Sequence, residues 1–205
     1  MLLKGIAVVM RIAGGVSGVI RSAVMFYKRN LPHWHPESRC IFLTWRLYGS
    51  LPFGFLRGLR LRSNLSPAEE FRLAEKLLDR ATEGPLWLKN PAVAGAVITV
   101  LQRGALEFRH YDLHAYCVMA NHVHALLTPL ARIRNITRAV KGIAAQAGNR
   151  LLHRTGERFW QDESFDHWVR TEGEFIRIQK YIENNPVKAG LVAKAENWPW
   201  SSASK

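Results

Sequence analysis

The fold of this chain is decided by two adjacent segments, His110-Tyr-Asp-Leu-His-Ala-Tyr-Cys-Val-Met119 and His122-Val-His-Ala-Leu-Leu-Thr-Pro129. The first is rich in aromatic and β-favouring residues, and only Ala120-Asn121 separates it from the second. Short runs of this kind joined by a brief turn are typical of paired antiparallel strands, so we expect a hairpin. Residues two apart on a strand point to the same face, so His122 and His124 should share one face of the sheet.

The patterns around this hairpin predict one further strand and four helices. The expected strand covers residues 39–48, and the expected helices cover residues 66–82, 90–103, 132–153 and 171–185. Helix starts are indicated by Ser66, Asn90 and Thr171, each of which begins a capping pattern. Helix ends are indicated by Gly104 and Pro186. This order of elements predicts an α+β sandwich in which one antiparallel sheet faces helices.

The composition indicates a basic protein of one domain. The chain has 205 residues, a formal net charge of +13 and a pI near 10.3. An acidic partner is therefore expected, with nucleic acid favoured over an anionic membrane surface. The two cysteines, Cys40 and Cys117, lie in apolar runs and imply reduced thiols in a cytosolic protein, not a disulfide framework.

The first 30 residues are interpreted as an N-terminal extension to a domain that covers residues 31–205. Residues 1–24 are apolar, but Lys4, Arg11 and Arg21 interrupt them. A transmembrane helix needs roughly 20 consecutive apolar residues, so this segment is not expected to span a membrane. A signal peptide is the weaker alternative, because the apolar stretches are short and no clear cleavage site follows.

The expected helix over residues 132–153 has a basic face. Arg134, Arg138 and Lys141 fall on one side of it, away from the apolar stripe. Such a face is either an ordinary solvated surface or a contact for the DNA backbone. The charge of the whole chain favours DNA.

Four side chains are candidates for chemistry. His122 and His124 can meet one metal ion, although a His-x-His triplet alone is weak evidence. We interpret the second triplet, His33-Trp34-His35, as incidental, because it precedes a proline in an expected loop. Tyr181 and Asn185 stand four apart on the last helix and share a face, so they could supply a nucleophile and a third metal ligand. Alternatively, Tyr181 packs in the interior and Asn185 ends the helix.

Several long motifs then carry a resemblance to a known family. The segment Val118-Met-Ala-Asn-His-Val-His-Ala-Leu-Leu127 resembles the HUH segment of the single-strand tyrosine transposases of bacterial insertion sequences. Residues 159–170, 181–192 and 198–202 resemble the REP-associated branch of that family in order and spacing, and so does Leu31-Pro-His-Trp-His-Pro36. The resemblance runs from about residue 25 to the end.

The resemblance implies a ferredoxin-like sandwich and a divalent metal ion, Mg²⁺ or Mn²⁺. It implies that Tyr181 cuts single-stranded DNA beside a hairpin repeat, through a 5′-phosphotyrosine intermediate, and that the strand is later rejoined. It also implies a monomer or homodimer that works in the bacterial cytoplasm at the nucleoid, with no membrane partner. Imidazole ligands suit transition metals, so the identity of the ion stays open.

Two features depart from the family. Ala120 stands where the family usually has proline, and residues 1–24 have no counterpart, so Met25 is a candidate for the true start. Two alternatives to the transposase are kept. One is a domesticated protein that binds hairpin DNA without cutting it, for which Ala120 is the only support. The other is a metal-dependent hydrolase that uses bound water and in which Tyr181 is structural.

Overall fold

The computed structural model describes residues 25–28, 32–35, 39–52, 54–55, 58, 65–81 and 84–204, with only the backbone path given before residue 39. The expected extension of residues 1–24 lies outside this part of the chain, so the division at residue 30 stays a prediction. Among the described residues, no helix is both long and apolar enough to cross a membrane.

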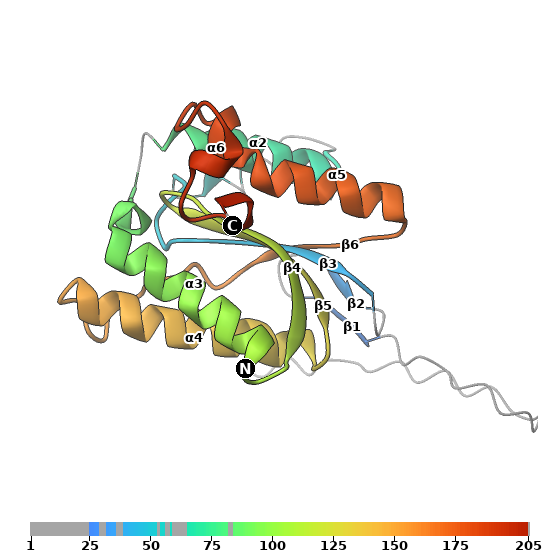
Figure 1. The fold of residues 1–205 in the computed structure, drawn as a ribbon, viewed down its shortest axis with the longest axis horizontal. Coiled ribbons are helices and arrows are strands. Elements are labelled where there is room, and N and C mark those ends of the chain that lie inside the picture. The colour runs from blue at the N-terminus through green and yellow to red at the C-terminus, as the bar shows by residue number, and fades with distance from the viewer. Residues whose placement is uncertain are drawn as a thin grey trace, which may run out of the picture.

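A four-stranded antiparallel sheet forms the middle layer of the protein (Figure 1). Its strands are β3 (Ile41–Arg46), β4 (Tyr111–Val118), β5 (His122–Pro129) and β6 (Phe165–Trp168), in the order β4-β5-β3-β6. Helices connect β3 to β4 and β5 to β6, which gives the βαββαβ order of a ferredoxin-like sandwich. The expected α+β fold is confirmed, and β4 and β5 form the expected hairpin.

Helices α3 (Pro91–Leu106) and α4 (Ile133–Leu151) cover one face of the sheet (Figure 1). The side chain of Asn90 accepts a hydrogen bond from the Ala92 amide and caps α3, as its sequence predicts. The apolar residues between these helices and the sheet include Leu43, Trp45, Val93, Val97, Leu101, Val123, Ala125, Leu127, Ile136 and Val140.

Helices α2 (Pro67–Arg80), α5 (Glu172–Glu183) and the single turn α6 (Asn185–Lys188) lie on the opposite face (Figure 1). A complete capping box between Ser66 and Glu69 begins α2. The buried residues here include Phe42, Ala115, Cys117, Leu126 and Ile182. Both faces of the sheet are therefore covered, which explains why β3 is buried on both sides.

The C-terminal residues cover the outer edge of β4. The Val118 amide donates to the Trp200 carbonyl at 2.8 Å, and the Trp198 indole donates to the Val118 carbonyl at 3.0 Å. This pairing protects an edge strand that would otherwise be open. Three short 3₁₀ turns complete the described elements: η1 (Trp87–Lys89), η2 (Ala195–Asn197) and η3 (Ser202–Ser204).

The expected end of the second helix at Gly104 is wrong. α3 continues to Leu106, and Gly104 lies inside it. A Cβ atom at this position would come within 2.3 Å of the Tyr111 hydroxyl oxygen. The glycine therefore allows the helix to approach β4, where the Tyr111 hydroxyl donates to the Leu101 carbonyl.

The last helix also differs from the expectation. α5 ends at Glu183, and Asn185 begins the new turn α6 instead of ending the preceding helix. Pro186 occupies the first turn of α6, where proline costs no hydrogen bond. The strand β6 was not expected, because four residues are too few to show alternation.

The interpretation of His33-Trp34-His35 as a loop is wrong as well. These residues belong to β2 (Pro32–His35), which pairs with β1 (Met25–Lys28) in a separate two-stranded sheet. The triplet is extended because it pairs with β1. The residues around Pro36 alone do not indicate this pairing.

Candidate active site

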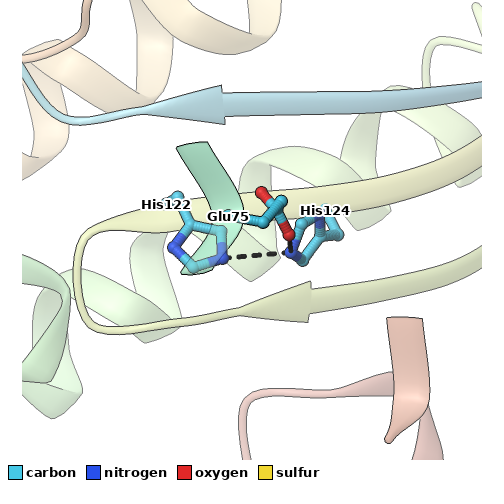
Figure 2. A group of neighbouring side chains, drawn as sticks. All are labelled: Glu75, His122 and His124. Carbon is cyan, nitrogen blue, oxygen red and sulfur yellow. Dashed lines mark hydrogen bonds and ion pairs between the residues drawn. The ribbon is translucent and has the colours of Figure 1, made fainter. Parts of the chain in front are cut away.

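His122 and His124 lie side by side on β5 and point to the face of the sheet that α2 and α5 cover (Figure 2). Both side chains are fully buried. Their Nε2 atoms are 3.0 Å apart, so the two rings converge on one point. The expectation that residues two apart on this strand share a face is confirmed.

Neighbouring polar groups fix the orientation of both rings. The Asn121 amide nitrogen donates to the Leu78 carbonyl at 3.1 Å, so its Oδ1 faces Nδ1 of His122 at 2.7 Å. A carbonyl oxygen only accepts hydrogen bonds, so His122 must carry its proton on Nδ1 and keep a lone pair on Nε2. On the other ring, Thr44 Oγ1 lies 2.8 Å from Nδ1 of His124.

Glu75 reaches the same point from α2 (Figure 2). Its Oε2 lies 3.3 Å from Nε2 of His124, and ligand atoms of Glu75, His122 and His124 all lie within 4.8 Å of one another. Sequence reasoning missed this carboxylate. The sequence does contain an indication of this role. Glu75 has the helical spacing of the apolar residues Phe71, Ala74 and Leu78 on the inner side of α2, where an unpaired charge would be costly.

Tyr181 and Asn185 complete the group that the sequence predicts. The Tyr181 hydroxyl donates to Oε2 of Glu75 at 2.5 Å, and its ring lies edge-on to the ring of His124 at 5.7 Å. The side-chain nitrogen of fully buried Asn185 lies 3.2 Å from Nε2 of His124. The structure thus brings all four predicted residues together. Tyr181 lies in α5 and Asn185 begins α6, so the helix breaks between them.

The electrostatics of the site favour a neutral His122 and an ionised Glu75. Burial lowers the pKa of His122 to about 3, so this ring is neutral at pH 7. Burial disfavours the charged form of Glu75. Attraction to His124 and hydrogen bonds from His124 and Tyr181 outweigh this effect and lower the Glu75 pKa to about 2. Burial and the negative charge of Glu75 raise the pKa of Tyr181, so the resting hydroxyl keeps its proton.

A second carboxylate lies one turn further along α2. Oδ1 of Asp79 is 3.9 Å from Nε2 of His122. Burial, and then the charge of Glu75, raise the Asp79 pKa to about 6. The site therefore holds two acids next to the candidate nucleophile.

The residues present fit a divalent cation. Neutral His122, ionised Glu75 and the Asn185 carbonyl are suitable ligands for such an ion. Oε1 of Glu75 and Oδ1 of Asn185 are buried and have no hydrogen-bond partner within the described part of the chain. Buried polar atoms normally have partners, so these two oxygens are available to bind a ligand.

We expect Asn121→Ala to weaken metal binding by about 10- to 100-fold, as is typical when a group that orients a ligand is removed. Without its partner, His122 can turn and carry its proton on Nε2. Titration with Mn²⁺ measures the affinity, and Asn197→Ala, an exposed asparagine in η2, is the matched control. Equal affinities for both variants would show that the tautomer does not depend on Asn121.

The predicted DNA contacts lie elsewhere. Arg134, Arg138 and Lys141 are on α4, which covers the face of the sheet opposite to the histidines. They line a pocket of about 420 Å³ between α4 and residues 159–166. The Lys141 ammonium donates to the carbonyls of Gln161 and Asp162 and to the Ser164 hydroxyl, at 2.8 to 3.1 Å, so it also ties these elements together.

Comparison with known proteins gives a family for the central part of the chain. Residues 88–185 match the protein family described as "Transposase IS200 like". The match covers His122, His124, Tyr181 and Asn185. Glu75 lies before it.

Two curated proteins are similar to parts of the chain. A REP-associated tyrosine transposase of Escherichia coli (strain K12) is 26% identical over 95 residues, which cover 46% of this chain and 55% of that protein. A putative REP-associated tyrosine transposase of Haemophilus influenzae is 24% identical over 107 residues, which cover 47% of this chain and 61% of that protein. The similar regions thus span little more than half of these relatives.

The fold is shared with a solved structure of a REP-associated tyrosine transposase bound to a REP hairpin. The TM-score is 0.50 at 17% sequence identity, over 85% of this chain and 82% of that chain. Residues 88–185 of this chain thus match the IS200-like transposase family, and parts of the chain are similar to REP-associated tyrosine transposases.

Proposed function

We propose that this protein is a metal-dependent endonuclease and strand transferase that acts on single-stranded DNA beside hairpin-forming repeats, through a 5′-phosphotyrosine intermediate. One observation carries the proposal. The hydroxyl of Tyr181 lies 2.5 Å from a Glu75 oxygen that is itself 3.3 Å from His124, so a nucleophile and a set of metal ligands share one carboxylate.

The residues of the site have separate roles in this reaction. His122, His124, Glu75 and Asn185 would hold a divalent cation, Mg²⁺ or Mn²⁺. When bound, the ion supplies Lewis acidity toward a non-bridging oxygen of the scissile phosphate. Tyr181 attacks the phosphorus, and Glu75 is placed to accept its proton as the Oη–P bond forms.

The bond that breaks joins phosphorus to the 3′ oxygen of the preceding nucleotide. That oxygen takes up a proton from solvent water and leaves as a 3′ hydroxyl, while the 5′ phosphate stays bonded to Tyr181. Attack by a 3′ hydroxyl on the phosphotyrosine reverses the step. Because the bond energy is kept in the phosphodiester, rejoining needs no ATP.

The net charge of the chain and its relatives support DNA as the proposed partner. The net charge of +13 suits a polyanion, and a protein with the same fold was solved with a REP hairpin. Arg134 and Arg138 are exposed on α4 and are the proposed backbone contacts. Lys141 is also a proposed contact to the DNA backbone. Its ammonium group donates to oxygen atoms of the protein, among them the Gln161 carbonyl. The protein would work in the cytoplasm at the nucleoid, as a monomer or homodimer.

We expect Arg134→Ala and Arg138→Ala each to flatten the salt dependence of hairpin binding by about one unit in the log–log slope, because each removes one phosphate contact. Fluorescence anisotropy at several salt concentrations measures the slope. Arg150→Ala, an exposed arginine in the last turn of α4, is the control. Unchanged slopes for all three variants would show that this face is only solvated.

The proposal is tested with a labelled hairpin that carries a single-stranded 5′ flank, incubated with protein and Mg²⁺ or Mn²⁺ and separated on a denaturing gel. A covalent protein–DNA band that depends on metal is expected. Cleavage without an adduct would show a hydrolase. Binding without cleavage would show a domesticated hairpin-binding protein. The only sequence support for that alternative is Ala120, and the turn that contains Ala120 leaves both histidines in place.

A further inference from the structure

The proposed site is acidic although its substrate is a polyanion. Glu75 and Asp79 lie on the same side of α2, and both act electrostatically on Tyr181. Together these two carboxylates offset the charge of one divalent ion. A phosphodiester that approaches Tyr181 adds a further negative charge, which a cation of the protein on the side of the tyrosine would offset.

Lys188 stands in that position. It ends α6, seven residues after Tyr181 and three after Asn185, and its Nζ lies 4.1 Å from the centroid of the Tyr181 ring. Its charge also acts on Asp79. The side chain is exposed, and among the described residues it makes no ion pair, so its donors are open to a ligand from solvent.

We propose that Lys188 binds a non-bridging oxygen of the scissile phosphate and holds it over Tyr181, opposite the histidines. This inference rests on the proposed function, because it assumes attack by Tyr181. A lysine ammonium suits a single phosphate oxygen as a point charge with three movable donors. The phosphate would then lie between two cationic groups, the ion held by α2 and β5 and the ammonium from α6.

An ordinary role for Lys188 is packing of its stem on the tyrosine ring. Lys188→Met keeps an unbranched apolar side chain on the ring and removes only the charge. Lys188→Arg keeps the charge. Lys180→Met, an exposed lysine next to Tyr181 in sequence, controls for the loss of one surface charge.

The test is single-turnover adduct formation on two substrates, a hairpin with the natural scissile phosphate and one with a methylphosphonate at that position. Methylphosphonate replaces one non-bridging oxygen by a methyl group and removes the charge. On natural DNA, Lys188→Met should be about 10- to 100-fold slower than the unchanged protein, the range for a lost charge-assisted hydrogen bond. On either methylphosphonate diastereomer the difference should shrink to about 3-fold or less. Lys188→Arg should stay within about 5-fold of the unchanged protein, and Mn²⁺ affinity should not change.

The outcomes separate this inference from the proposed function. If the unchanged protein forms no adduct with natural DNA, the proposed function fails, and the inference fails with it. If it forms the adduct but Lys188→Met is as fast, Lys188 only packs and the inference alone is overturned. An equal loss on both substrates would also overturn it, because the effect would not depend on the charge of the phosphate.

Discussion

Tyr181→Phe is expected to abolish the covalent protein–DNA adduct, with a loss of at least about 1,000-fold in single-turnover rate, because the attacking atom is removed. The ring should keep its edge contacts with Phe42 and His124. Hairpin affinity and Mn²⁺ affinity should therefore stay within about 2-fold of the unchanged protein. A denaturing gel measures the adduct, and calorimetry and anisotropy measure the two affinities.

Tyr48→Phe is the matched control for this prediction. Tyr48 is an exposed tyrosine in the turn after β3, and its ring lies beneath the guanidinium of Arg158. This variant should form the adduct at the normal rate. A phosphotyrosine adduct that survives Tyr181→Phe would mean that another tyrosine attacks, and the assignment of α5 to the reaction would be wrong.

The parts of the site that the sequence predicts are those with local periodicity. His122 and His124 share a face because a strand repeats every two residues. The helical spacing of Tyr181 and Asn185 correctly predicts that both reach the site, although the helix breaks between them and Asn185 begins α6. The same local patterns predict the β4–β5 hairpin and the start of α2, which the structure confirms.

The parts that the sequence does not predict depend on contacts between distant segments. Glu75 is 47 residues before His122, and nothing in α2 alone says that its inner side faces β5. Gly104 carries a helix-ending signal that the approach of Tyr111 overrides. Lys141 falls on a basic helical face, but its engagement with the carbonyls of residues 161 and 162 follows only from the packing of α4.

Glu75→Gln is the variant that tests the centre of the site, and we expect it to slow adduct formation by about 10²- to 10⁴-fold, the usual contribution of a group that accepts a proton in the reaction. Glutamine has nearly the same size, and its carbonyl oxygen can still accept the hydrogen bond of Tyr181, so the fold should survive. Glu196→Gln, which removes a charge from an exposed position in η2, should leave the rate unchanged.

Titration with Mn²⁺ then separates the two roles that Glu75 could have. If the carboxylate mainly holds the ion, affinity should fall by about 10- to 100-fold and excess Mn²⁺ should restore much of the rate. If it mainly accepts the tyrosine proton, the Mn²⁺ affinity should fall by a smaller factor than the rate of adduct formation, and excess Mn²⁺ should not restore that rate. The hydrogen bond of 2.5 Å from the Tyr181 hydroxyl to Oε2 of Glu75 favours the second result. A normal rate and normal affinity together would mean that the carboxylate only pairs with buried histidine, and the proposed reaction would lose its proton acceptor.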